Sequence, residues 1–187
     1  MKTAGLSLVE LLVTLALAAV LLGMALPAFQ DLAANSRGSA ALNQIIGAVN
    51  YARSAAVTHH ATVTLCPGVD RRCLARDQWH RGALLFLDHN GNGLLETDDP
   101  VLGRLPSLDD GGRIYWRSFR NRGYLQFMAR GYTAWQNGNF LYCSVNRAAS
   151  EARMVILNAQ GRIRVARDRN GDGVVEDASG RPVSFPA

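Results

Sequence analysis

Lysine is almost absent from this 187-residue sequence: Lys2 is the only one, so every later basic residue is an arginine. Arginine favours bidentate contacts with phosphate, but a GC-rich genome produces the same bias, so this absence alone identifies no ligand. The formal net charge is +5, and the stretch from Arg104 to Arg169 holds twelve arginines against four acids, a local balance of +8. Such a stretch indicates either an anionic partner, such as nucleic acid or a membrane surface, or an ordinary solvated face.

Catalytic and metal-binding patterns are also missing. The four histidines, His59, His60, His80 and His89, have no nucleophile or carboxylate grouped with them as a catalytic set. No spacing of cysteine and histidine resembles a zinc site. We therefore expect neither enzymatic activity nor a cofactor, and we place His59 and His60 at a helix end, where they interact with the helix dipole.

Charge is absent from Leu11 to Leu26. Together with Leu6–Val9, this run is long enough to cross a hydrocarbon core as a helix. Glu10 stands near its start, where an acidic side chain costs roughly 3 kcal/mol on insertion scales and is a candidate functional residue, unless it lies at the headgroups. A secretory signal peptide is the rival interpretation, but the run is long and GMALPAF is a poor cleavage site.

The stretch Gly5-Leu6-Ser7-Leu8-Val9-Glu10, followed by about twenty apolar residues, resembles the leader of type IV prepilins and pseudopilins, although Leu6 stands where phenylalanine is commoner. The resemblance implies that a prepilin peptidase cuts between Gly5 and Leu6 and methylates the new amine. Glu10 would pair with that amine on a neighbouring pilin, which offsets the cost of burying its charge. The implied location is the inner membrane, single-pass with a periplasmic domain, and then a cell-surface pilus.

The rest of the chain predicts a pilin-like α+β fold, with a long N-terminal helix packed on antiparallel sheet. We expect a leader (1–5), a hydrophobic transmembrane and filament-core helix (6–29), an amphipathic half of the helix (30–58) and a β-rich domain with a C-terminal tail (59–187). Pro27 should kink the helix, and Asn35–Gly38 should loosen or interrupt it. Beyond that point, apolar residues recur at helical spacing, at Leu42, Ile45, Ile46, Val49, Ala52 and Ala56.

Short alternating or apolar segments, separated by clusters of Gly, Asn, Asp and Ser, predict the strands. They are ATVTLC, GALLFLD, VLGRL, RIYWRSF, YLQFMA, NFLYCSV, ARMVILN and RIRVAR. The aromatic residues near the basic stretch are expected to be core or rim residues rather than platforms for base stacking; they are Trp116, Tyr124, Tyr132 and Trp135.

Three cysteines, Cys66, Cys73 and Cys143, are disulfide candidates if the domain lies outside the inner membrane. Their odd number leaves one unpaired or paired between chains. Cys66 and Cys73 bracket a short turn-like stretch, CPGVDRRC, and are the favoured pair, although Cys143 could pair with either. The closed loop is short, so the gain in stability would be modest.

Two loops, beginning at Asp88 and Asp168, fit D-x-[DN]-x-[DN]-G, the front half of a calcium-binding loop. The twelfth position holds Asp99 in the first loop and Ser179 in the second, and neither loop has the glutamate typical of that position. We favour hairpin turns whose Asx side chains bond their own backbone. The alternative calcium ligands are Asp88, Asn90, Asn92, Glu96 and Asp99.

The segment Gly161-Arg162-Ile163-Arg164-Val165 is the candidate site for nucleic acid. On a strand, Arg162 and Arg164 share a face while Ile163 and Val165 point into the core. Guanidinium groups about 7 Å apart match successive phosphates, and Arg167 and Arg169 could extend the contact. Such a surface would bind without sequence preference and would lose affinity with salt.

The order of segments, from YARSAAV through VTLCP, GALLFLDHNGNG, FMARGYT and GNFLYC to MVILNAQGRIRV, resembles the GspH/FimT class of minor pilins and pseudopilins. In FimT-type proteins a G-R-x-R motif carries DNA binding during natural transformation, and Gly161, Arg162 and Arg164 match it. The resemblance therefore implies double-stranded DNA as a partner beside other pilins. Two alternatives stay open: a FimU-type minor pilin that initiates pilus assembly, and a minor pseudopilin of type II secretion.

Overall fold

The computed structural model describes residues 7–185 and divides into two compact units, one up to Ser36 and one from Arg37 onwards. A single helix, α1 (Leu8–His59), begins in the first unit and ends in the second. Its segment Leu8–Leu26 is exposed and has a mean hydropathy of 2.4, so it is long and apolar enough to cross a membrane. This segment fits a single-pass membrane anchor.

The predicted interruption of α1 at Asn35–Gly38 is wrong, because the helix continues through these residues. The glycine instead permits close packing: a Cβ atom at Gly38 would lie 3.0 Å from Cε1 of Tyr142. The helix ends where it was expected to, at His59, and His60 follows with a left-handed φ of 51°.

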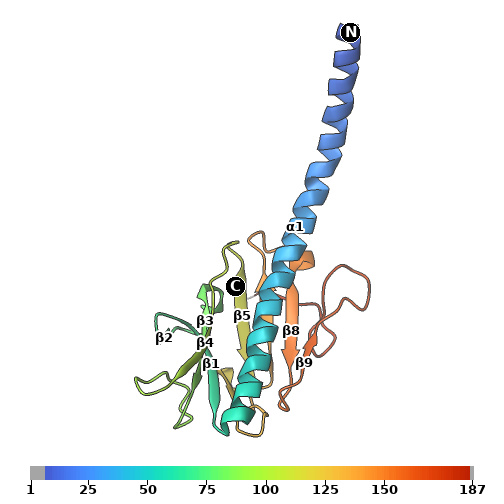
Figure 1. Cartoon of the computed structure of the whole chain (residues 1–187). Coiled ribbons are helices and arrows are strands. Elements are labelled where there is room, and N and C mark those ends of the chain that lie inside the picture. The colour runs from blue at the N-terminus through green and yellow to red at the C-terminus, as the bar shows by residue number, and fades with distance from the viewer. Residues whose placement is uncertain (1–6, 186–187) are drawn as a thin grey trace. The chain divides into compact units, whose positions relative to one another are not determined.

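The second unit contains two antiparallel sheets (Figure 1). The five-stranded sheet has the order β2-β1-β3-β4, with β6 also paired to β1. Its strands are β1 (Val63–Val69), β2 (Arg72–Cys73), β3 (Ala83–Leu87), β4 (Val101–Leu105) and β6 (Leu125–Phe127).

The four-stranded sheet has the order β5-β7-β8-β9. Its strands are β5 (Arg113–Ser118), β7 (Gly138–Cys143), β8 (Arg153–Leu157) and β9 (Ile163–Val165). Short 3-10 helices lie at Trp79–Arg81, Phe119–Asn121 and Ala149–Glu151. The predicted α+β class is confirmed.

The second half of α1 packs against both sheets, as Figure 1 shows. The predicted apolar face is buried at Leu42, Ile45, Val49, Ala52 and Ala56, whereas Ile46 is only partly buried. Three aromatic rings fill the centre: Phe140 stacks on Trp116 at 4.3 Å and meets Trp79 edge-on at 4.9 Å. Residues of α1 and of both sheets share this core, so the helix determines how the two sheets are positioned within the second unit.

The C-terminal tail forms a further layer that the sequence did not predict. It covers the face of the four-stranded sheet turned away from α1, here called the outer face. Val175 and Val183 pack there against Leu141 and Met154, and Val183 N–H donates to the Val175 carbonyl at 3.1 Å. Ala166 N–H donates to the Met154 carbonyl at 2.9 Å. Ala166, the residue after β9, is thereby buried in the same cluster as the tail residues Val175 and Val183.

The favoured disulfide, Cys66–Cys73, is confirmed. It links the paired strands β1 and β2. Cys143 is a free thiol, buried on the outer face under the tail, and burial raises its pKa to about 12.

Candidate nucleic-acid interface

A tight turn connects β8 to β9 and places the G-R-x-R motif. Gly161 N–H donates to the Asn158 carbonyl at 3.0 Å, and Asn158 N–H donates to the Arg162 carbonyl at 3.1 Å. The Asn158 side-chain oxygen accepts from Arg162 N–H at 2.8 Å. Gly161 has a φ of 75°, in the left-handed region that glycine adopts without cost. The backbone on both sides of Arg162 is therefore fixed.

The same turn is held from the helix side. Arg53 in α1 donates through Nη1 to the Gly161 carbonyl at 3.4 Å. Gly161 also lies against Phe127 of β6 and the Gly131 carbonyl, which leave no room for a Cβ atom. Three separate segments thus converge on Gly161 and set the direction in which β9 leaves the turn.

Arg162 immediately precedes β9 and Arg164 lies in its middle, so both are directed to the same side. Arg164 is paired with Ile156, a member of the outer-face cluster. Both arginines are exposed. The predicted shared face of the two arginines agrees with this register, at a spacing of about 7 Å for two residues of extended chain.

The prediction that Val165 points into the core is wrong: its side chain is 51% exposed. Ile163, on the same side, is partly buried against the main core. Val165 is exposed even though its partner Val155 is buried, because β9 is a three-residue edge strand that is paired on one side only. An exposed valine in an edge strand leaves that edge accessible to a partner.

Arg167 and Arg169 are also exposed, in the segment that follows β9. Within residues 7–185, none of the side chains of Arg162, Arg164, Arg167 and Arg169 forms an ion pair. The carboxylate between them, Asp168, accepts from the backbone N–H groups of two glycines in its own loop, and these hydrogen bonds lower its pKa. Four arginines are therefore exposed, two at the edge strand β9 and two in the segment that follows it.

Two further arginines from elsewhere in the sequence lie at or next to segments that contact the β8–β9 turn. Arg53 contacts the turn directly, and Arg130 is exposed beside Gly131, whose carbonyl faces Gly161. Neither arginine was predicted from the sequence as part of the site. Arg53 lies within the apolar repeat of α1, and no sequence pattern indicates that its side chain contacts residue 161. Arg130 is near the turn because the next residue, Gly131, packs against Gly161.

The aromatic residues divide into two groups. Trp116 is buried in the core and Tyr124 is partly buried, as expected. Tyr132 is 45% exposed and Trp135 is 71% exposed. The loop that carries them is bonded to the β8–β9 turn, since Thr133 N–H donates to the Ala159 carbonyl at 3.0 Å.

The first candidate calcium loop is closed by hydrogen bonds. The carboxylate of Asp88 is buried and accepts from Thr64 Oγ1 at 2.6 Å, from Gln126 Nε2 at 2.8 Å and from Gly93 N–H at 2.9 Å. These donors tie the loop to β1 and β6. The carboxylate thus serves as a structural acceptor here.

The two asparagines among the other candidate ligands accept hydrogen bonds from backbone N–H groups two residues later, as expected for Asx turns. The side-chain oxygen of Asn90 accepts from Asn92 N–H, and that of Asn92 accepts from Leu94 N–H. Glu96 accepts from both asparagine amides, and Asp99 accepts from Glu96 N–H. Among residues 7–185, no group of three or more His, Cys, Asp or Glu is arranged to hold a metal ion. Calcium binding was the alternative to these turns, and it stays untested.

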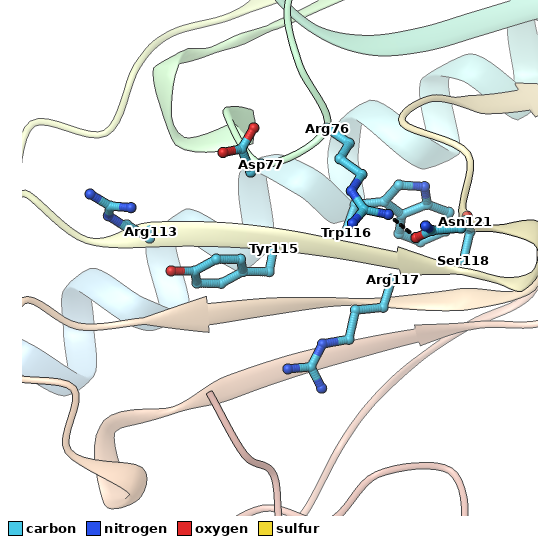
Figure 2. Close-up of a pocket in the computed structure, with 8 residues that line it drawn as sticks. All are labelled: Arg76, Asp77, Arg113, Tyr115, Trp116, Arg117, Ser118 and Asn121. Atoms are coloured by element: carbon cyan, nitrogen blue, oxygen red, sulfur yellow. Dashed lines mark hydrogen bonds between the residues drawn. The ribbon is translucent and has the colours of Figure 1, made fainter. Parts of the chain in front are cut away.

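A second group of arginines lies at the opposite edge of the four-stranded sheet, on β5. Figure 2 shows Arg113 and Arg117 along this strand, beside a cavity of about 370 Å³ that Arg76 also lines. Arg76 bonds Asn121, and Arg117 donates to the Ser184 carbonyl at 2.7 Å. Two of these three guanidinium groups therefore already have a hydrogen-bond partner in the chain, although both are exposed, which leaves β9 as the more available cationic edge.

The predicted assembly residues lie in the first unit. Gly5 and Leu6 are outside the described residues. Glu10 is exposed in the first turn of α1, and its N–H donates to Ser7 Oγ at 3.2 Å. Its backbone is thereby capped, and its carboxylate is exposed on the apolar helix.

Comparison with known proteins identifies the family. The family described as type II transport protein GspH matches residues 41–161, more than half of the chain. Two crystal structures of the type IV minor pilin FimU from Pseudomonas aeruginosa are similar. One has a TM-score of 0.56 and 18% identity and covers 71% of this chain and 90% of that one. The other has a TM-score of 0.51 and 20% identity and covers 69% and 91%.

A weaker structural likeness is to the minor pseudopilin EpsH from the Type 2 Secretion System of Vibrio cholerae, with a TM-score of 0.44 and 12% identity over 70% of this chain and 92% of that one. Among curated proteins, none matches the sequence. The family match rests on sequence, and the FimU structures have the same fold. The chain belongs to the GspH family of minor pilins and pseudopilins.

Proposed function

We propose that this chain is a minor type IV pilin that binds double-stranded DNA through its C-terminal edge strand during natural transformation. The observation that carries the proposal is the set of four exposed arginines at and after β9, none of them ion-paired within the described residues; they are Arg162, Arg164, Arg167 and Arg169. Guanidinium groups that have no carboxylate partner remain available for phosphate oxygens.

The physical basis of this binding is electrostatic. Each arginine that neutralises a phosphate releases a condensed counterion, so affinity falls steeply with salt and does not depend on base sequence. Arg162 and Arg164 stand on a backbone fixed by the β8–β9 turn, which reduces the entropy lost when they meet a phosphate chain. Arg53 and Arg130 add positive charge from neighbouring segments.

Assembly into a filament is a second part of the proposal. A prepilin peptidase cuts between Gly5 and Leu6, and Glu10 then pairs with the new amine of a neighbouring pilin. The exposed carboxylate on an apolar helix supports this role, because an unpaired charge in a membrane or filament core is costly. Before assembly, the segment Leu8–Leu26 holds the protein in the inner membrane.

One observation favours a different function. The match to the family model ends at residue 161, so the motif arginines lie just beyond the matched residues. A minor pilin that primes assembly, or a minor pseudopilin of type II secretion, would need no DNA contact at β9. In that case the arginines would contact neighbouring subunits.

The test is a titration of fluorescently labelled duplex DNA with the full-length chain in neutral detergent micelles. The variant Arg162→Ala/Arg164→Ala should lose at least ten-fold in affinity. The matched control is Arg72→Ala/Arg104→Ala, which removes two exposed arginines from the five-stranded sheet. Equal losses in both variants would mean that only net charge matters, and the assembly or secretion function would then be favoured.

A further inference from the structure

Trp135 is the exposed tryptophan of the chain. Its side chain is 71% exposed, whereas Trp79 and Trp116 are 2% and 5% exposed. Tyr132, three residues earlier, is 45% exposed. Large aromatic side chains left in water at one place mark contact sites for a partner, because burying them is strongly favourable.

The loop around Trp135 is built to hold this exposed position. Trp135 has a φ of 59°, in the left-handed region that bulky residues rarely occupy. The residues on both sides are anchored: Gln136 N–H donates to Thr133 Oγ1 at 3.3 Å, and the Gln136 side-chain oxygen accepts from Gln126 N–H at 2.5 Å. Gln136 itself is buried. A strained backbone kept in place by such contacts points to a functional position.

The same loop is bonded to the turn that carries the arginine motif. Thr133 donates to the Ala159 carbonyl through both its N–H, at 3.0 Å, and its Oγ1, at 3.1 Å. The Gly131 carbonyl lies against Gly161, the residue before Arg162. The aromatic loop is therefore held directly against the turn that carries the arginine motif.

We propose that Trp135, with Tyr132 three residues before it in the same loop, is a stacking site for unpaired nucleobases, so that this loop and the arginines bind single-stranded DNA or the open ends of a duplex. The proposal deepens the DNA-binding function above and rests on the same cationic surface. Arginines that hold the phosphates, together with an aromatic ring that accepts a base, form the combination that single-strand binding needs. Paired bases inside a duplex are already stacked and cannot use the ring.

The exposed tryptophan also supplies the readout. Because Trp79 and Trp116 are buried, quenching of intrinsic fluorescence by an added oligonucleotide reports contact at Trp135. Full-length protein in neutral detergent would be titrated with an oligothymidylate and, separately, with a blunt duplex longer than the site. We expect quenching by the single strand and far less by the duplex.

Two variants separate stacking from charge. Trp135→Asn removes the ring with a residue that adopts the left-handed conformation readily, and should weaken oligothymidylate binding about ten-fold while leaving duplex binding unchanged. Trp135→Phe keeps an aromatic face and should retain most of the affinity. Unchanged single-strand affinity in Trp135→Asn would overturn the proposal.

The remaining outcomes distinguish this proposal from the DNA-binding function itself. If Arg162→Ala/Arg164→Ala abolishes duplex binding while Trp135→Asn has no effect on either ligand, the DNA function holds and base stacking is refuted. If wild-type protein binds neither ligand, both proposals are wrong. If Trp135→Asn reduces incorporation into filaments without changing DNA affinity, Trp135 contacts another pilin, and the stacking proposal is overturned.

Discussion

Gly161 packs directly against the ring of Phe127: a Cβ atom at position 161 would lie 2.8 Å from Cε1 of that ring. The same Cβ would lie 3.0 Å from the Gly131 carbonyl oxygen. The glycine of the G-R-x-R motif is therefore a packing residue. It lets the β8–β9 turn sit against β6, and so it places the arginines that follow.

Replacing Gly161 with alanine should reduce the free energy of unfolding by about 2 kcal/mol, because a left-handed backbone and a steric overlap are both imposed. For a chain of this size the melting temperature should fall by about 6 °C. The control is Gly180→Ala, which has a similar φ of 79° but nothing within 4 Å of the added atom. Equal effects of the two variants would show that the contact with Phe127 adds nothing.

The disulfide should stabilise the β1–β2 end of the domain. It closes a loop with a sequence separation of 7, for which loop entropy predicts about 2.5 kcal/mol. The variant Cys66→Ser/Cys73→Ser should therefore unfold at a lower temperature. Thiol labelling at pH 8 without reductant gives an independent check: no label on native protein, because Cys143 is buried and its pKa is raised to about 12, and one label after denaturation. A label on Cys66 or Cys73 would contradict the pairing.

Asp99 should make stability depend on pH in the acid range. Burial raises its pKa, but hydrogen bonds from Glu96 N–H and from His89 outweigh burial and hold the pKa below the ordinary 3.8. The contribution of the ionised Asp99 carboxylate to the free energy of unfolding is therefore complete above pH 3.8. It is lost as the pH falls through the lower pKa of the folded state. At pH 7, Asp99→Asn should cost about 2 kcal/mol.

The difference in melting temperature between wild type and Asp99→Asn should narrow below pH 4. The control is the exposed neighbour, Asp98→Asn, which should change the melting temperature little at any pH. A difference that stays constant from pH 7 to pH 3 would show that the ionised form of Asp99 is not what the fold stabilises.

Glu10 should be required for incorporation into filaments but not for cleavage between Gly5 and Leu6. The variant Glu10→Ala should be cleaved normally, since the peptidase site lies five residues earlier, but it should enter filaments poorly because its neighbour's amine loses a partner. Immunoblots of membrane and sheared-filament fractions would measure both steps. Thr14→Ala, one helical turn further on, is the control in the same helix. Normal incorporation of Glu10→Ala would refute the pairing.

Much of the fold could be predicted from the sequence because local patterns agree with it. The apolar repeat from Leu42 to Ala56 marks the buried face of α1, and the alternating segments fall on the observed strands. The predicted interruption at Asn35–Gly38 is wrong, since a glycine that lets a helix approach Tyr142 looks the same in sequence as one that interrupts a helix. Only the tertiary contact distinguishes them.

The candidate site was predicted in part. Arg162 and Arg164 follow from a short motif, and their shared side follows from strand alternation. The exposure of Val165 depends on β9 being a short edge strand, which no local pattern reveals. Trp135 was expected in the core or rim because aromatic residues usually lie there. Its exposure results from a loop that is fixed by contacts with residues far away in the sequence.

The measurement that tests the central proposal most directly is the salt dependence of duplex DNA binding by wild type and by Arg162→Ala/Arg164→Ala. A plot of log affinity against log salt concentration should be linear, with a slope set by the number of phosphates neutralised. If both arginines contact phosphates, the double variant should have a slope smaller in magnitude by about 1.8. The control Arg72→Ala/Arg104→Ala should keep the wild-type slope. Identical slopes for wild type and the motif variant would contradict DNA binding by β9.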